Sequence, residues 1–413
     1  MLSLRLKVDP IVIIDDLSKK LKKDIFCEIE DGKVIGVDLS DTPIEDLSFL
    51  SKLRDLVWLS LRNCKRVRSL EALKSLRKLS SLDLSYMRIE DISPIKHLKN
   101  LRRLSLRGCI NIRSLEPLSS LRKLEELILD KTYIRDITPL GKLKNLRKLS
   151  LWFVRLVEDF RVVSKLRNLE DLNLGGTQFS DCRVLLGLRK LKRLVLSVTR
   201  IQGYEALSKM NSIKVLHLDN TPISEIDFLG HLKNLRELNL NATGVYDPYP
   251  IGNLRQLEIL DLGNTNIAQT DFLRRLKALR VLNLSNTGIE SLGEISHLEC
   301  LEVLDIRNTL IEDLHDLRNL KSLRVLDISN CYISDISVVE KLSALERLYI
   351  DGTLVEDITP IIRLAKRFRR LKVVGLGGLK IPDSQVEELR KLGVKVITKT
   401  LVEIVNEHGS DVT

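Results

Sequence analysis

Residues 79–100 read LSSLDLSYMRIEDISPIKHLKN, and this stretch decides the fold because it recurs with a period of 22 residues. Similar repeats begin at Leu124, Leu235 and Leu323. Apolar residues recur at positions 1, 4, 6, 11, 14, 17 and 20 of the repeat. The first three are spaced as in a short strand, and the later ones recur every third residue, as in a 3₁₀-type turn. Each repeat therefore predicts one coil of a solenoid.

The repeats leave little of the chain for other domains. About fifteen of them run from residue 34 to residue 370, with 23-residue variants beginning at Leu56, Leu101 and Leu146. Because an open coil would expose its core, we expect a cap at each end. Residues 1–33 are predicted to form an N-terminal cap of a helix and a hairpin, and residues 371–405 the last repeat and a C-terminal cap. Residues 406–413 are polar and are expected to be a loose tail.

Two polar positions of the repeat are predicted to be structural. Position 9 is threonine in ten repeats and cysteine in three. A small polar side chain after the strand can bond to backbone groups of its own coil and of the neighbouring coil. Position 13 is aspartate in eight repeats, where a short carboxylate can cap the turn that follows.

The pattern LxxLxLxxTxIxDLxPLxxL resembles the leucine-rich repeat family in its 22-residue class, which occurs in bacterial internalins and in the leucine-rich regulatory subunit of protein phosphatase 1. This resemblance implies an α/β fold, a curved right-handed solenoid with a parallel sheet on the concave face. Short 3₁₀ or helical turns would cover the convex face. Threonine, rather than the commoner asparagine, at position 9 is expected to change the hydrogen bonds but not the architecture. The resemblance also suggests a phosphatase-regulating adaptor, an alternative that no residue here specifically supports.

The sequence shows no arrangement typical of a catalytic or metal site. Its histidines lack metal-ligand spacing, and no phosphate-binding loop or nucleophile motif stands in its required context. We therefore expect no enzyme activity, no metal and no cofactor. The six scattered cysteines form no CxxC pair, and no apolar run resembles a secretion signal or a membrane span. We expect a cytoplasmic, monomeric protein without a membrane partner.

Positions 3, 5, 7 and 8 are predicted to face outward on the concave side, where a ligand would bind. Both tryptophans of the chain occur at such positions. Exposed aromatic and arginine side chains are typical of protein interfaces. We therefore predict that a protein partner of unknown identity binds the N-terminal half of this face. The predicted site consists of Trp58, Arg62, Tyr86, Arg103, Arg107, Lys148, Trp152, Phe153 and Arg193.

Some of these side chains have purely structural alternatives. Trp58 can instead cover the junction with the N-terminal cap, and Phe153 can pack over the irregular repeat that carries Val154 at position 9. In the C-terminal half, position 5 carries aspartate or asparagine in five successive repeats. This ladder can bind a cation or a basic peptide, although both residue types are ordinary at that position. Its members are Asn239, Asp261, Asn283, Asp305 and Asp327.

The formal net charge of +11 is unevenly distributed along the chain. Residues 61–200 contain 32 basic and 14 acidic residues, whereas residues 201–360 contain 15 and 24. The basic excess recurs in the segment that leads from each repeat into its next strand. It includes Lys78, Arg102, Lys123, Arg147, Lys190 and Lys192. A solvated, charge-rich face accounts for this basic flank. Nucleic acid, RNA in particular, is the alternative partner, although no aromatic residues interleave with these cations.

Overall fold

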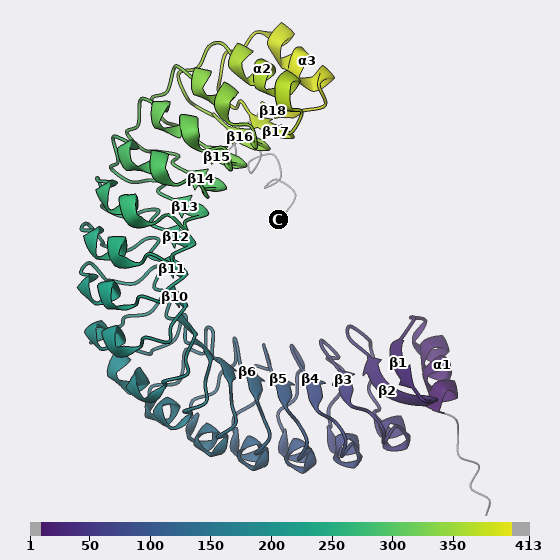
Figure 1. Cartoon of the computed structure of the whole chain (residues 1–413). Coiled ribbons are helices and arrows are strands. Elements are labelled where there is room, and N and C mark those ends of the chain that lie inside the picture. Colours follow the sequence, from purple (N-terminus) through teal and green to yellow (C-terminus); the bar gives the residue numbers. More distant parts are fainter. Residues whose placement is uncertain (1–9, 399–413) are drawn as a thin grey trace, which may run out of the picture. The chain divides into compact units, whose positions relative to one another are not determined.

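The computed structural model describes residues 10–398 and divides the chain into two compact units, Met1–Ala206 and Leu207–Thr413 (Figure 1). The predicted loose tail, residues 406–413, lies outside the described residues, as does the end of the predicted C-terminal cap. Within each unit the strands lie along the concave side and the 3₁₀ turns along the convex side (Figure 1). The predicted repeat solenoid is thereby confirmed.

The first unit begins with helix α1 (Pro10–Leu21). Strand β1 (Phe26–Glu30) pairs antiparallel with β2 (Lys33–Asp38), and seven three-residue strands continue the sheet in parallel. They are β3 (Trp58–Ser60), β4 (Ser81–Asp83), β5 (Arg103–Ser105), β6 (Glu126–Ile128), β7 (Lys148–Ser150), β8 (Asp171–Asn173) and β9 (Arg193–Val195). The 3₁₀ turns are Ser48–Lys52, Glu71–Ser75, Ser93–His97, Glu116–Ser120, Thr138–Lys142, Arg161–Lys165, Cys182–Gly187 and Tyr204–Lys209.

The second unit repeats this arrangement and ends with two α-helices. Its parallel strands are β10 (Val215–His217), β11 (Glu237–Asn239), β12 (Ile259–Asp261), β13 (Val281–Asn283), β14 (Val303–Asp305), β15 (Val325–Asp327), β16 (Arg347–Tyr349), β17 (Val373–Gly375) and β18 (Lys395–Ile397). The 3₁₀ turns are Asp227–His231, Tyr249–Asn253, Asp271–Arg275, Gly293–His297, His315–Asn319 and Ser337–Lys341. Helix α2 (Thr359–Phe368) replaces the turn before β17, and α3 (Asp383–Lys391) precedes β18. Within residues 10–398 no helix has the length and apolar character needed to cross a membrane.

The core of each coil follows directly from the apolar spacing of the repeat. In the repeat from Leu79 all seven apolar positions are at most 2% exposed. Ile95 and Leu98 each donate a backbone N–H to the carbonyl oxygen three residues earlier, at 3.1 and 2.9 Å. This is the bonding of a 3₁₀ turn, and it places every third side chain on the same, inner side. Neighbouring strands pair in register, so that position 3 lies beside position 3, as in Ser81 and Arg103.

The polar ladders have the predicted structural roles. Each position-9 threonine donates its hydroxyl to the position-6 carbonyl of its own repeat, as Thr132 does to Leu129 at 2.7 Å. The position-9 cysteines instead donate to the preceding repeat, as Cys109 does to Leu84. Each position-13 aspartate accepts the backbone N–H two residues later. These aspartates are Asp46, Asp91, Asp136, Asp181, Asp247, Asp313, Asp335 and Asp357.

The chain leaves each of the strands β2 to β17 through a residue with positive φ at position 8. In the second unit this residue is asparagine in five repeats, as at Asn286, with φ of 55°. The first unit places Tyr86, Lys131, Phe153 and Val198 in the same conformation. Left-handed backbone costs a side-chain-bearing residue about 1–2 kcal/mol, least for asparagine. The first unit therefore retains unfavourable residue types at several of its strand exits.

Candidate functional site

An aromatic pair follows strand β7 in the first unit. The rings of Trp152 and Phe153 meet edge to face, with centroids 4.5 Å apart and planes at 74°. Lys131 Nζ lies 4.9 Å from the Trp152 centroid, and the guanidinium carbon of Arg107 lies 5.9 Å from it. The guanidinium carbon of Arg155 lies 4.8 Å from the Phe153 centroid. Three cations from three successive repeats thus surround two aromatic rings, and we name these five residues with Asp130 the Trp152 cluster.

Asp130 is the single carboxylate of the Trp152 cluster. It is 7% exposed, and it accepts hydrogen bonds from the Ser150 hydroxyl and, at 3.0 Å, from the backbone N–H of Trp152. Its second oxygen lies 3.7 Å from Arg107 Nε, too far for a hydrogen bond. Arg107 Nε is buried and has no hydrogen-bond partner among the described residues. The cluster therefore carries three cations against one carboxylate and holds a guanidinium N–H that is not satisfied.

Two aromatic rings at position 8 lie over glycines of the next repeat. A β-carbon added to Gly108 would come within 2.5 Å of the Tyr86 ring, and one added to Gly176 within 2.8 Å of the Phe153 ring. The guanidinium carbon of Arg62 lies 5.4 Å from the Tyr86 centroid. Five of the nine predicted partner-binding residues thus take part in cation–aromatic contacts at the strand exits. They are Arg62, Tyr86, Arg107, Trp152 and Phe153.

Phe153 contacts both its own irregular repeat, which carries Val154, and the repeat that follows. Its ring lies against Trp152 and Gly176. The positive φ values of Tyr86 (61°) and Phe153 (56°) mark strained backbone. The same conformation recurs at position 8 of the other repeats, so it belongs to the repeat and does not by itself mark a site.

Trp58 contacts the N-terminal cap, in agreement with the structural alternative given for it. Its Nε1 donates to Glu28 at 2.5 Å, its ring stacks on Phe26 with centroids 6.0 Å apart, and it lies directly over Gly36. These contacts fasten the β1–β2 hairpin to the first parallel strand. Trp58 also borders a shallow hollow on the strand face that Arg103 shares. None of these contacts of Trp58 involves a residue of the Trp152 cluster.

The remaining predicted site residues lie at position 3 of their strands. Lys148 pairs with Glu126 at 2.9 Å, and Arg193 lies 3.8 Å from Asp171. Burial raises the pKa of the Asp171 carboxyl, and Arg193 opposes this rise. Arg103 is exposed and forms no ion pair within residues 10–398. Lys148 and Arg193 are thus partly neutralised, whereas Arg103 is available to a partner.

Lys131, Arg155 and Asp130 belong to the cluster but were missed in the sequence. Lys131 and Arg155 stand at positions 8 and 10 of their repeats. The predicted site includes only aromatic residues at position 8 and no residue at position 10. The strand register could have revealed these residues in the sequence. The in-register pairing of β6 with β7 places the residues that follow the two strands side by side.

The cations of the predicted basic flank are engaged across neighbouring repeats. Four of them pair with carboxylates: Lys78 with Asp55, Arg102 with Glu125, and both Arg147 and Lys192 with Glu170. Lys123 and Lys190 donate to the side-chain oxygens of Asn100 and Asn168, at 2.7 and 2.8 Å. Hydrogen bonds from Lys192 and Arg147 lower the pKa of Glu170. These contacts support the interpretation of the flank as a solvated structural ladder.

The position-5 ladder of the second unit also has structural contacts. Each of its five members accepts the backbone N–H two residues later, as Asp327 does from Ser329 at 2.9 Å. Burial raises the pKa of Asp305 within it. Among the described residues, no group of histidine, cysteine, aspartate or glutamate side chains is arranged to hold a metal ion.

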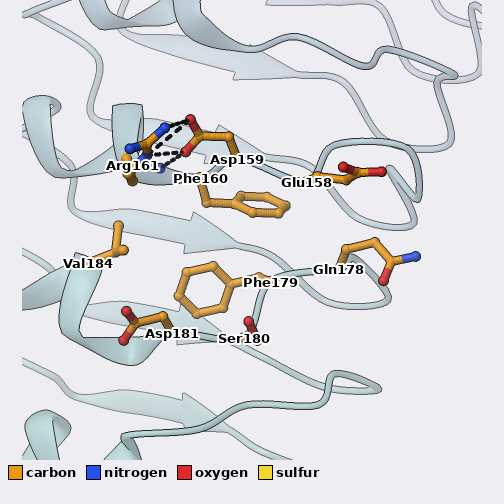
Figure 2. Close-up of a pocket in the computed structure, with 9 residues that line it drawn as sticks. All are labelled: Glu158, Asp159, Phe160, Arg161, Gln178, Phe179, Ser180, Asp181 and Val184. Carbon is orange, nitrogen blue, oxygen red and sulfur yellow. Dashed lines mark hydrogen bonds and ion pairs between the residues drawn. The ribbon is translucent and has the colours of Figure 1, made fainter.

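A hollow between two loops of the first unit is lined by two buried aromatic residues (Figure 2). The rings of Phe160 and Phe179 meet edge to face at 5.4 Å and fill the space between the loops. Arg161 bonds to Asp159 at 2.7 Å, and these hydrogen bonds lower the pKa of Asp159 to about 2. Since these two charges neutralise each other, the arrangement stabilises the loops.

The repeat geometry agrees with comparisons to known proteins. The family model "Leucine Rich repeats (2 copies)" matches residues 77–120, 277–319 and 321–363. The chain is a leucine-rich repeat protein. A search of curated protein sequences finds no match to it.

Solved structures resemble this leucine-rich repeat protein over most of its length. A leucine-rich repeat protein of Leptospira interrogans has 24% identity and a TM-score of 0.76, covering 87% of this chain and 94% of its own. An internalin of Listeria monocytogenes has 23% identity and a TM-score of 0.67, covering 81% and 94%. The ectodomain of the Arabidopsis thaliana receptor kinase GASSHO1/SCHENGEN3 has 18% identity and a TM-score of 0.55, covering 91% and 60%. That ectodomain was solved in complex with CASPARIAN STRIP INTEGRITY FACTOR 2. These likenesses show the fold.

Proposed function

We propose that this leucine-rich repeat protein is a non-enzymatic scaffold that binds a protein partner on the concave face of its first unit, through the Trp152 cluster. The observation that carries the proposal is the Trp152–Phe153 pair with its three surrounding cations. Arg62, Tyr86 and Arg103 extend this surface, and Lys148 and Arg193 border it.

Physical chemistry favours a binding role for such a cluster. Each cation–aromatic contact contributes about 0.5–2 kcal/mol, and the contacts hold long side chains in place before a partner arrives. Binding then costs less side-chain entropy. Tryptophan and arginine are also the residues whose truncation most often weakens protein complexes.

The charge of the cluster restricts what the partner presents to it. Arg107 Nε is buried without a hydrogen-bond acceptor, and Asp130 is the only carboxylate beside three cations. The side chain of Arg107 as a whole is 40% exposed. An acidic side chain of the partner could therefore pair with the accessible part of its guanidinium and balance the charge of the cluster. The complex of the Arabidopsis ectodomain supports the general idea that this fold binds polypeptides.

The test is quantitative affinity capture from the source lysate with four baits. The wild-type chain is compared with Trp152→Ala, with Arg107→Ala and with Tyr246→Ala. Tyr246 is the matched control, because it is a 61% exposed aromatic residue of the second unit. Recovery of a partner that binds this surface should fall about 10-fold or more with the first two variants. With the third variant it should stay at the wild-type level.

Folding is checked by circular dichroism and urea unfolding of each bait. If properly folded Trp152→Ala and Arg107→Ala captured the same proteins at the same level as wild type, the Trp152 cluster would be excluded as the binding surface.

A further inference from the structure

The loops after the strands of the first unit carry exposed apolar and basic residues in two consecutive repeats. Ile110 and Tyr133, at position 10, are 44% and 52% exposed. Arg113, at position 13 of its 23-residue repeat, and Arg135, at position 12, are also exposed. Within residues 10–398 the side chains of these arginines form no ion pair or hydrogen bond. We name these four residues the basic loop flank.

The corresponding loops of the second unit carry charges of the opposite sign. Leu310 and Tyr332, at position 10, are 46% and 58% exposed. Glu290 and Glu312, at position 12, are exposed, and neither forms an ion pair with any part of the chain that the structure describes. We name these four residues the acidic loop flank.

The acidic loop flank is one continuous surface with a hollow in it. Leu310 donates its backbone N–H to Ile289 of the preceding repeat at 3.0 Å, so consecutive loops are in contact. All four residues of the acidic loop flank line the hollow, together with Asp313 and Asp316. No basic residue lines it. An arginine side chain with its apolar stem fits such a hollow in both charge and polarity.

We propose that the basic loop flank of one copy of this chain binds the acidic loop flank of a second copy. The spacing within the two flanks differs, because Ile110 and Arg113 are three residues apart and Leu310 and Glu312 are two. Each flank nevertheless presents two exposed apolar side chains and two exposed charges of a single sign, and the two signs are opposite. Ile110 and Tyr133 would meet Leu310 and Tyr332. Arg113 and Arg135 would meet Glu290 and Glu312. This proposal departs from the monomer expected from the sequence.

The contact joins different surfaces of the two copies, so it is a head-to-tail interaction. Such contacts either close into a ring or continue as an open chain. Four half-exposed apolar residues give a small interface, and exposed ion pairs are screened by salt. We therefore expect association at concentrations on the order of 100 µM in low salt and dissociation in high salt.

Sedimentation velocity of the full chain from 5 to 200 µM, in 50 mM and in 500 mM NaCl, tests the proposal. At the highest concentration in low salt, species larger than the 47.2 kDa chain are expected. They should disappear in high salt. A single 47.2 kDa species throughout would overturn the proposal.

Charge reversal on each flank identifies the surfaces. Arg113→Glu with Arg135→Glu makes both flanks acidic, and Glu290→Arg with Glu312→Arg makes both basic. Neither variant should associate with itself. An equimolar mixture of the two should associate again, because an acidic flank then meets a basic one. Association that persists in either variant alone, or that the mixture does not restore, would contradict these surfaces.

Two controls separate this contact from other causes. Lys96→Glu with Lys99→Glu changes the net charge as much as the arginine reversal but lies outside the flanks, and it should keep wild-type association. Tyr332→Ala should weaken association without changing charge. If the wild type stayed monomeric while a fluorescent oligoarginine peptide bound it and lost binding in the Glu290→Arg, Glu312→Arg variant, the hollow would belong to a basic partner instead of a second copy.

Discussion

The phenyl ring of Phe153 lies over Gly176 of the next repeat, in the space that a β-carbon would occupy. Gly176 has φ of +67°, and a β-carbon would come within 2.8 Å of the ring. We expect Gly176→Ala to lower the free energy of unfolding by more than the about 1–2 kcal/mol of left-handed strain, since the ring must also move. Gly32→Ala is the control, because Gly32 has φ of +70° and nothing within 4 Å.

Urea unfolding followed by tryptophan fluorescence measures both variants, and both tryptophans lie in the first unit. A displaced Phe153 ring should also change the emission of Trp152 in the folded state. Equal losses of stability in the two glycine variants would mean that the ring moves without cost.

Val198 is a β-branched residue in left-handed backbone, with φ of 58°, and it is 48% exposed. Asparagine is the usual residue at this position in the second unit. We expect Val198→Asn to raise the unfolding free energy by about 1 kcal/mol, because asparagine tolerates this conformation. The reverse change, Asn286→Val, should lower it by at least as much, since Asn308 also donates to the Asn286 side chain at 2.7 Å. Chemical denaturation of each variant provides the comparison.

If Val198→Asn instead lowered stability, the valine side chain would contribute packing that outweighs its strain. If it raised stability and weakened partner capture, strain would be retained at this strand exit for binding.

The solenoid was predictable because its determinants are local. Three-residue spacing of apolar side chains coincides with the 3₁₀ hydrogen bonds of Ile95 and Leu98, and each position-13 aspartate bonds within two residues of itself. Both effects act within one repeat, so periodicity alone reveals them.

The candidate site was only partly predictable because its contacts join different repeats. Trp58 faces the strand side as expected, but its partners Glu28 and Phe26 belong to the hairpin, whose placement the repeat pattern does not define. Lys131 joins the Trp152 cluster because positive φ at position 8 turns its side chain toward the next strand exit. The cations of the basic flank likewise contact carboxylate or asparagine side chains of the neighbouring repeat.

The basic flank is expected to bind RNA weakly, because its cations already contact acidic or asparagine side chains. We expect no saturable binding of a single-stranded 20-mer RNA at 150 mM NaCl in fluorescence anisotropy. Any binding at 20 mM NaCl should fall steeply with salt. Glu170→Gln should strengthen that low-salt binding, because it releases Arg147 and Lys192 from their shared carboxylate. Tight binding at 150 mM NaCl would favour the RNA alternative over a structural ladder.

Acid is expected to destabilise the fold through its cross-repeat carboxylates. Hydrogen bonds from Lys192 and Arg147 lower the pKa of Glu170, and those from Lys372 and Arg324 lower the pKa of Glu346. These groups bind fewer protons in the folded chain than in the unfolded chain, so their stabilisation is complete well above the ordinary glutamate pKa of 4.5. It is lost as pH falls through their lower folded values.

Buried aspartates act in the opposite direction. Burial raises the pKa of Asp305 and Asp351, so these groups take up protons more readily when folded and favour the folded state as pH falls. Among the described residues, the carboxylates whose pKa is lowered outnumber those whose pKa is raised. Asp159, with a pKa of about 2, is one of the lowered ones. We therefore expect a net loss of stability from about pH 5 downward.

Urea unfolding of the first unit, followed by tryptophan fluorescence between pH 3 and 7, tests this pH dependence. Glu170→Gln removes a carboxylate that pairs with two cations, so this variant should be less stable at pH 7 and should lose less stability than wild type on acidification. Glu90→Gln is the control, because Glu90 lies in the first unit, is exposed and forms no ion pair within the described chain, and its curve should follow wild type. If Glu170→Gln and wild type lost the same amount of stability between pH 5 and 3, the contribution of Glu170 to acid denaturation would be negligible, and the ladder would be held by neutral hydrogen bonds and strand pairing instead.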